Sequence, residues 1–247
     1  MRRNILITGA SSGLGEEMAR QFAAKGHNLA LTARREDRLK ALQTELTTKH
    51  PGLTILVHTL DVNDHDAVFE TFRAIDAELT LDRIIVNAGI GKGAPLGTGR
   101  FDANLITAQT NFTAVLAQAE AAMELFRARN AGHLVFISSV AGVRGLPKAV
   151  TTYAATKAAV ATLSEGLQLE LLGKPITVST ISPGYIKSEL NEHVAKTPLI
   201  VDTVPGVRAM VAAIEAEKAK AFVPAWPWVL LARVLKYAPL PLVKRMI

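Results

Sequence analysis

The stretch Ile5-Leu6-Ile7-Thr8-Gly9-Ala10-Ser11-Ser12-Gly13-Leu14-Gly15 joins an apolar run of strand length to a turn that holds three glycines. The residues that follow, 16–24, carry apolar side chains at helical spacing and predict a helix. Glycines let a backbone approach a phosphate closely, and a helix N-terminus presents free N–H groups to it. The spacing G-x-x-x-G-x-G differs from the dinucleotide fingerprint G-x-G-x-x-G. The rest of the chain must therefore decide whether this turn binds a phosphate or only connects a strand to a helix.

Composition excludes several classes of protein. The chain has 247 residues, no cysteine and a net charge of +6, so one α/β domain is expected and a disulfide framework is not. The apolar run after Met1-Arg2-Arg3 is too short for a signal peptide, and no window is long and apolar enough to span a membrane. No nucleic-acid motif accompanies the positive charge. We therefore expect a cytoplasmic protein with a small anionic ligand and no nucleic-acid partner.

Apolar strand-like segments alternate with helix-like segments along the chain. The expected strands are 5–8, 28–32, 53–60, 83–87, 133–137 and 176–181, and the expected helices are 16–24, 36–49, 66–79, 101–130, 151–172 and 206–219. Strands that are apolar on both faces predict a parallel sheet covered by helices on each side. We therefore expect an α/β fold, a Rossmann-type doubly wound parallel sheet with helices on both faces in a single domain.

In such a sheet, ligands bind outside the carboxyl ends of the strands. Most of the unusual polar residues and glycines of this chain fall there. The segments concerned are 8–15, 33–35, 61–62, 87–89, 138–139 and 182–185. We therefore expect one site at this edge of the sheet.

The motifs at these strand ends also have a characteristic order. They are Thr8-Gly9-Ala10-Ser11-Ser12-Gly13-Leu14-Gly15, Asp61, Asn87-Ala88-Gly89, Asn111, Ser138-Ser139, Tyr153-Ala154-Ala155-Thr156-Lys157 and Pro183-Gly184. With them, the chain from Asn4 to about Ser188 resembles the classical short-chain dehydrogenase/reductase (SDR) family. The resemblance implies an oxidoreductase that passes a hydride between a nicotinamide dinucleotide and a ketone or secondary alcohol, without a metal. The six histidines are scattered along the chain, so the sequence shows no cluster that suggests a metal site.

Tyr153 and Lys157 are four residues apart and share a helix face. A free phenol has a pKa of about 10, and a nearby ammonium favours its phenolate. The resemblance implies that Tyr153 is the catalytic acid and base, and that Lys157 lowers its pKa and binds the nicotinamide ribose. The alternative is a half-buried tyrosine beside a surface lysine.

Two further catalytic roles come from the resemblance. Ser139 is expected to hold the substrate oxygen, with Ser138 as the rival, and Asn111 is expected to hold a water in a proton relay toward Lys157. The interval from Ser139 to Tyr153 is one residue longer than expected, and an insertion near 143–148 would absorb it. The alternative for Asn111 is a place on a helix surface.

The choice of cofactor depends on the end of the second strand. An acid there binds the ribose 2′-hydroxyl of NAD, whereas an arginine accommodates the 2′-phosphate of NADP. Here Ala33 is followed by Arg34 and Arg35, which favours NADP(H). Glu36 and Asp37 are the counter-evidence, although acids also suit the start of a helix.

The resemblance implies a set of cofactor contacts. Asp61 and Val62 would border the adenine, Pro183 and Gly184 would abut the nicotinamide, and Ser188 would contact the carboxamide. The whole expected set is Gly9, Ser11, Ser12, Gly13, Leu14, Gly15, Arg34, Arg35, Asp61, Val62, Asn87, Ala88, Gly89, Tyr153, Lys157, Pro183, Gly184 and Ser188.

The C-terminal part of the chain does not match the family pattern. We expect residues 1–220 to form the NADP-binding catalytic domain, with a substrate loop at about 185–205, and residues 221–247 to form an apolar, basic extension of the same domain. The extension would line the substrate pocket, form a subunit interface, or lie on an anionic membrane through 225–247. A sizeable apolar substrate is expected from this extension and from Leu190, Val194, Leu199, Ile200 and Val201.

The sequence therefore predicts an NADP(H)-dependent carbonyl reductase that acts as a homodimer or homotetramer through 101–130 and 151–172. Two alternatives remain at this point: a dinucleotide-binding regulatory protein without turnover, and a peripheral membrane protein. The substrate, the physiological direction and the hydride face stay open.

Overall fold

One seven-stranded sheet organises the molecule, as a computed structural model of residues 2–91, 93–189 and 199–246 describes it. All neighbouring strands are parallel, in the order β3-β2-β1-β4-β5-β6-β7. The strands are β1 (Asn4–Thr8), β2 (Asn28–Ala33), β3 (Ile55–Thr59), β4 (Arg83–Val86), β5 (Gly132–Ile137), β6 (Ile176–Pro183) and β7 (Lys220–Val223). The predicted doubly wound Rossmann-type fold is confirmed.

The side chains of β1 alternate between two hydrophobic cores, one on each face of the sheet. Ile5 and Ile7 belong to the first core, and Leu6 belongs to the second. Successive residues of a strand point to opposite faces, so a strand that is apolar throughout must be covered on both.

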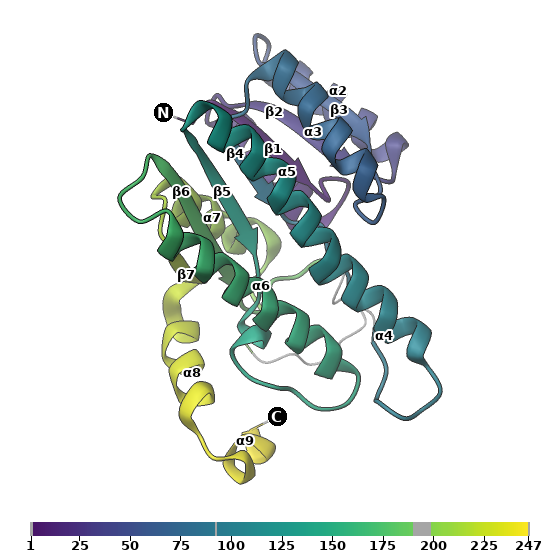
Figure 1. The fold of residues 1–247 in the computed structure, drawn as a ribbon, viewed down its shortest axis with the longest axis vertical. Helices are drawn as coiled ribbons and strands as arrows, with labels where there is room; N and C mark the ends of the chain where they lie inside the picture. The colour runs from purple at the N-terminus through teal and green to yellow at the C-terminus, as the bar shows by residue number, and fades with distance from the viewer. Residues whose placement is uncertain (1, 92, 190–198, 247) are drawn as a thin grey trace.

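Helices cover both faces, and α5 and α6 cross in front of the strands in Figure 1. Helices α1 (Gly13–Ala24), α2 (Glu36–Lys49) and α7 (Thr203–Glu215) supply the first core, for example through Phe22 and Met210. Helices α3 (His65–Leu79), α5 (Ala114–Arg129) and α6 (Thr151–Glu170) supply the second, for example through Phe72 and Val160.

The strand order reverses at β1, which lies between β2 and β4. The chain therefore leaves neighbouring strands in opposite directions, and a crevice opens beyond their carboxyl ends. The glycine turn after Thr8 lies at this switch point, and the catalytic candidates follow β4 and β5 along the same edge.

Two of the differences from the sequence prediction concern β7 and the helix predicted at 101–130. The four-residue strand β7 was not predicted; it pairs with β6 from Thr180↔Lys220 to Pro183↔Val223. The predicted helix 101–130 consists of α4 (Phe101–Ala108), a π-helical turn η1 (Gln109–Thr113) and α5. A four-residue strand is too short to show a periodic pattern in the sequence. A π-helical turn forms where side chains bind outside the helix, which the sequence alone does not show.

The chain ends in two helices, α8 (Ala225–Tyr237) and α9 (Leu240–Met246), which extend from one end of the molecule in Figure 1. Trp228 on the inner side of α8 is 5% exposed. The Arg144 guanidinium donates to the carbonyl oxygens of Leu235 (2.8 Å) and Lys236 (3.2 Å) at the end of this helix. Arg144 follows the 3₁₀ turn η2 (Val140–Val143), so α8 is fixed to the loop after β5. Along the described parts of the chain, each helix is too short or too polar to cross a membrane.

Candidate active site

The glycine turn closes against the end of β4. Gly9 and Gly13 have φ angles of +67° and +57°, which favour glycine. A Cβ atom on Gly9 would lie 2.8 Å from Ala88 Cα, and one on Gly15 would lie 2.3 Å from the Gly9 carbonyl oxygen. The turn can thus pack this closely against the end of β4 and against itself only because these positions lack side chains. A tight glycine turn that leads into a helix N-terminus fits the cradle of a dinucleotide pyrophosphate.

The Thr8 side chain connects this turn to β4. Its hydroxyl oxygen accepts hydrogen bonds from the backbone N–H groups of Asn87 (3.0 Å) and Ala88 (3.1 Å). In return, Asn87 Nδ2 donates to the Thr8 carbonyl oxygen (2.9 Å). Asn87 and Ala88 therefore hold the turn in place as well as lying beside it.

Asn111 lies in the π-helical turn η1 and is completely buried. Its Oδ1 accepts from the Ile90 N–H and its Nδ2 donates to the Ile90 carbonyl oxygen, both at 2.8 Å. The alternative of a helix-surface asparagine is therefore wrong. A π-turn inside a helix often marks a functional position, and here it directs the amide toward the segment after β4.

Lys157 is buried on α6, so the alternative of a surface lysine is wrong as well. Its Nζ donates to the Ile137 carbonyl oxygen (2.9 Å) and lies 5.9 Å from the Tyr153 ring centroid. A Cβ atom on Gly89 would lie 3.2 Å from Asn111 Oδ1 and 3.6 Å from Lys157 Nζ. The fold thus brings Asn111, Gly89, Tyr153 and Lys157 to one place.

The two titratable groups of this cluster depart from their ordinary pKa values. Burial lowers the pKa of the Lys157 ammonium to about 8. Burial raises the pKa of the Tyr153 phenol, a hydrogen bond with Ser139 opposes this rise, and Tyr185 adds to it. The sequence led us to expect a lowered pKa for Tyr153. The direction is opposite because burial is the largest contribution to the pKa of Tyr153, while the Lys157 ammonium donates to the Ile137 carbonyl oxygen.

Ser138 and Ser139 have different partners. The Ser138 hydroxyl is buried and donates to the Lys157 carbonyl oxygen (2.8 Å). The Ser139 hydroxyl accepts from the Ala141 N–H (3.1 Å) and hydrogen-bonds with Tyr153. Of the two, Ser139 is therefore the one that shares a site with the phenol. The long interval to Tyr153 is taken up by η2 and a second 3₁₀ turn, η3 (Lys148–Val150).

The arginines after β2 also differ. Arg34 is exposed and has no hydrogen-bond partner among the described residues, whereas Arg35 donates from Nε to Ser11 Oγ (3.2 Å). Arg35 and Arg38 both form ion pairs with Glu189. Arg35 therefore lies beside the glycine turn and shares Glu189 with Arg38, whereas Arg34 has no hydrogen bond to the described residues of the turn.

The remaining expected cofactor residues line the same edge. Asp61 is exposed and accepts from the Asn63 backbone and side chain, and Val62 is buried. Leu14 packs on the first core, and Ser12 precedes α1. A Cβ atom on Gly13 would lie 3.3 Å from Ser188 Cβ, so the segment after β6 reaches the glycine turn.

Aromatic side chains border the end of β6. The Trp228 indole lies on Gly184, where a Cβ atom would meet its Nε1 at 2.1 Å. Tyr185 contacts the same indole edge to face, with ring centroids 5.6 Å apart. Of the apolar residues expected at the substrate, Leu199 is exposed and Ile200 and Val201 are half-buried. Leu190 and Val194 lie outside the described residues.

Sequence reasoning missed three residues of this site: Arg38, Glu189 and Trp228. Arg38 follows Arg35 by three residues, a spacing that could have placed both on one side of α2. Glu189 and Trp228 reach the site only through tertiary packing, so no local sequence pattern could have predicted them. No group of acidic and histidine side chains in the described ranges could hold a metal ion.

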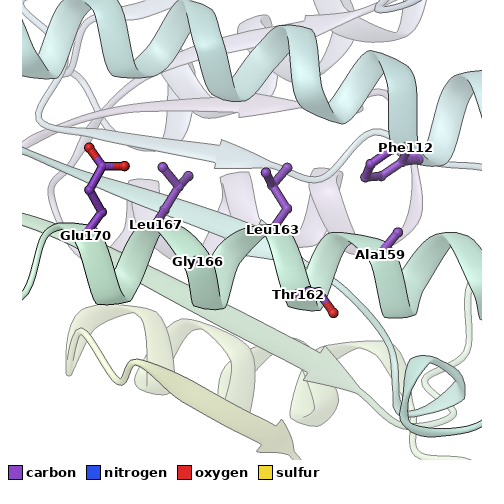
Figure 2. A pocket seen from close by; sticks show the side chains of 7 residues that line it. All are labelled: Phe112, Ala159, Thr162, Leu163, Gly166, Leu167 and Glu170. Atoms are coloured by element: carbon purple, nitrogen blue, oxygen red, sulfur yellow. The ribbon is translucent and has the colours of Figure 1, made fainter.

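A hollow of about 550 Å³ lies on the outer side of α6, away from these residues. It is lined by Phe112, Ala159, Thr162, Leu163, Gly166, Leu167 and Glu170. Figure 2 shows Leu163 and Leu167 pointing from α6 into this hollow, with Phe112 beyond them. Its lining is mostly apolar and contains none of the catalytic candidates.

Known proteins resemble this chain along most of its length. The family model described as short chain dehydrogenase matches residues 3–199. An uncharacterized oxidoreductase of Mycobacterium tuberculosis is 51% identical over 245 residues, which cover 99% of this chain and 97% of the relative.

Two solved structures share the fold and part of the sequence. A short-chain dehydrogenase from Sphingobium yanoikuyae, in complex with NADPH, is 29% identical with a TM-score of 0.83, over 98% of this chain and 95% of that one. The bulky-bulky ketone specific alcohol dehydrogenase from Comamonas testosteroni is 30% identical with a TM-score of 0.79, over 94% and 91%.

Proposed function

The chain belongs to the short chain dehydrogenase family of oxidoreductases, and from this premise we propose that it is an NADP(H)-dependent carbonyl reductase. It would pass a hydride between the nicotinamide and a ketone or secondary alcohol. The observation that carries this proposal is the position of the buried Lys157, whose Nζ lies 5.9 Å from the Tyr153 ring centroid at the end of β5 that Ser139 follows.

The chemistry divides between cofactor and protein. When bound, the nicotinamide supplies the hydride to the carbonyl carbon, or accepts it from the alcohol carbon. In reduction, Ser139 holds the carbonyl oxygen and the Tyr153 hydroxyl donates its proton to that oxygen. In oxidation, the Tyr153 oxygen takes the proton back. The Lys157 ammonium stabilises the phenolate that is formed, and Asn111 holds a water that leads protons toward Lys157.

The residues around the glycine turn fit the dinucleotide. Gly9, Gly13 and Gly15 carry no side chains at three positions of the turn, which lets a pyrophosphate approach its backbone closely. Asp61 and Val62 would border the adenine, the segment 87–89 would follow the bound cofactor, and Pro183, Gly184 and Ser188 would meet the nicotinamide. Residues 1–220 would form this catalytic domain, with 221–247 as its extension.

The preference for NADP(H) rests on the basic residues after β2. Arg35 donates a hydrogen bond to Ser11, and Arg38 binds the same Glu189 carboxylate as Arg35 does. Two guanidinium groups therefore lie near the glycine turn. Guanidinium groups bind phosphate through paired N–H donors. Arg34 would add charge from its exposed position. The relative from Sphingobium yanoikuyae was solved with NADPH, which agrees with this preference.

A sizeable apolar ketone is the substrate class that we propose. Tyr185 is 40% exposed beside Tyr153 and is held by Trp228, so one wall of the site is aromatic. Leu199, from the loop at 185–205, offers a further exposed apolar side chain. The ketone specificity in the name of the Comamonas testosteroni relative supports a bulky substrate.

The test is the variant Tyr153→Phe, which keeps the ring and removes the proton donor. Ketone-dependent NADPH oxidation should fall at least about a hundredfold, the scale of general acid–base catalysis. Tyr237→Phe is the matched control, because that phenol is exposed at the end of α8. Undiminished turnover in Tyr153→Phe would refute the proposal.

A regulatory protein that binds the dinucleotide without turnover is the alternative. Such a protein would need the glycine turn and the arginines but not the phenol. The cluster of Ser139, Tyr153 and Lys157 therefore favours catalysis, and turnover with any ketone decides between the two.

We propose a second role for the end of the chain, contact with an anionic membrane surface. The exposed apolar residues of α8 and α9 are Trp226, Val229, Leu230, Val234, Tyr237, Leu240 and Leu242. Exposed Arg233, Lys236, Lys244 and Arg245 lie among them, and no acidic residue follows Glu217. Aromatic, apolar and basic side chains in this combination suit a lipid interface. We call these eleven residues the C-terminal surface.

We also propose that the chain forms a homodimer or homotetramer through α5 and α6. The apolar hollow along α6 supports this assembly, because a second copy would cover Leu163, Leu167 and Phe112. Glu170 at its border pairs with Arg127 of α5 (2.6 Å), so the hollow ends in charged groups.

A further inference from the structure

The carboxylate of Glu189 lies where the basic residues of the cofactor site converge. Its Oε2 accepts from Arg35 Nη2 (3.1 Å) and Nη1 (3.2 Å), and its Oε1 accepts from Arg38 Nη1. The Ser12 hydroxyl also hydrogen-bonds with this carboxylate. Ser12 lies in the glycine turn, Arg35 directly precedes α2 and Arg38 lies in α2, whereas Glu189 comes from the segment after β6.

These contacts keep the carboxylate charged. The Arg38 hydrogen bond, with further contributions from Ser12 and Arg35, lowers the pKa of Glu189 to about 2. The group is therefore an anion at any pH at which the protein would work. The same contacts account for the raised pKa of Arg38.

The donors that hold Glu189 are those that a phosphate monoester needs. Two guanidinium groups offer paired N–H donors, and Ser11 and Ser12 add hydroxyl groups next to them. The Glu189 carboxylate thus stands in for an anionic ligand at this place. The proposed function assigns the same place to the 2′-phosphate of NADP(H). Two anions on one set of donors repel each other, so one must leave when the other binds.

Building on the proposed function, we propose that Glu189 competes within the molecule for the 2′-phosphate subsite. Its carboxylate leaves Arg35 and Arg38 when NADP(H) binds, and binding is weaker by the cost of breaking these ion pairs. NAD(H) has a hydroxyl at this position and leaves the ion pairs intact. Glu189 thereby narrows the preference for NADP(H) over NAD(H).

The expected effect is modest, because exposed ion pairs are weak. Glu189→Gln should lower the dissociation constant for NADP about three- to tenfold and change that for NAD less than twofold. Glu189→Ala should act in the same direction. Glu70→Gln is the matched control, since Glu70 is exposed on α3 and has no ion-pair partner among the residues the structure describes.

Calorimetric titration of the full chain measures ligand binding directly and so tests the competition by Glu189 without the need for turnover. The probes are adenosine 2′,5′-bisphosphate, which carries the 2′-phosphate, and 5′-AMP, which lacks it. Tighter binding of the bisphosphate alone in both Glu189 variants supports the competition. Unchanged or weaker binding in either variant overturns it, because Glu189 would then be a bystander or would help to hold the ligand.

A further variant separates this inference from the proposed function. Arg35→Gln should weaken the bisphosphate and leave 5′-AMP unchanged. If Arg35→Gln has this effect and the Glu189 variants have none, the phosphate subsite stands and only the competition fails. If the unmodified protein binds both probes equally, the NADP preference itself fails.

Discussion

At the scale of single residues, Lys157 is the group on whose charge the proposed mechanism depends most. It is buried and charged, and water cannot solvate its ammonium as it would at the surface. Burial therefore lowers its pKa to about 8. The ammonium form, which the proposed mechanism requires, is the form that is lost as the pH rises through that value.

We therefore predict a pH profile with a break on the alkaline side. The kcat/KM for ketone reduction should be level below pH 8 and fall up to about tenfold per pH unit above it, because it reports the free enzyme. Tyr153 stays protonated across this range since burial raises its pKa. Steady-state rates between pH 6 and pH 10 measure the profile.

A variant tells whether this break belongs to Lys157. Lys157→Arg keeps the positive charge at all these pH values, so the break should disappear from whatever activity remains. A break that persists unchanged in Lys157→Arg belongs to another group and contradicts the assignment.

The sequence indicated which residues form the site better than it indicated the contacts that they make. The order of Ser138-Ser139, Tyr153 and Lys157 pointed to the site, yet only the structure shows that Ser138 bonds to the backbone of α6 and Ser139 to Tyr153. The sign of the Tyr153 pKa shift was not predictable, because the degree of burial is a tertiary property.

At the scale of elements, α8 carries apolar residues on both its inner and its outer side. Its inner side packs Trp228 and Ala232 against the body, whereas Leu230, Val234 and Tyr237 remain exposed. A helix with apolar residues on both sides needs a second partner for the outer one. The basic residues of the C-terminal surface favour an anionic lipid interface as that partner.

We predict that the protein sediments with vesicles of mixed anionic and zwitterionic phospholipid and not with purely zwitterionic ones. Leu230→Ser with Tyr237→Ser should release it, because the surface then loses apolar area. Leu169→Ser with Leu172→Ser removes exposed apolar residues at the end of α6 and should not matter. Equal sedimentation of both double variants would contradict a role for α8.

The elements themselves were largely predictable from sequence. Long apolar strands such as β5 and helices with apolar faces such as α3 follow from periodicity. Strand β7 could not be found this way, because its four residues become a strand only by pairing with β6. The π-turn around Asn111 escaped for a similar reason, as its amide is held by Ile90.

At the scale of the whole molecule, the apolar hollow on α6 leaves the protein open to self-association. Gly166 lies in this hollow, and a side chain added there would meet nothing within the monomer. A large charged side chain at Gly166 would therefore leave the fold intact and block a second copy.

We predict a solution mass at a multiple of the 26.5 kDa chain mass, measured by light scattering after gel filtration. Gly166→Arg should shift the mass to that of one chain. Gly145→Arg is the control, because Gly145 is also open but lies in the loop between η2 and η3. A Gly166→Arg protein of unchanged mass would place the subunit contact elsewhere.

The fold and the site thus follow from the sequence to different extents. The glycine turn, the alternating strands and the motifs at the strand ends predicted the confirmed architecture. The aromatic contact that we propose as one wall of the substrate site could not be predicted in the same way. Tyr185 and Trp228 meet only because α8 packs against the end of β6.

Transfer of deuterium is the measurement that tests the central claim most directly. With a bulky ketone and NADPH deuterated at C4 of the reduced ring, in either configuration, the product alcohol should carry one deuterium on its carbinol carbon for one of the two configurations. Mass spectrometry of the product gives this result. Cofactor that binds while no ketone in a broad panel acquires deuterium would contradict the account and leave a dinucleotide-binding protein without turnover.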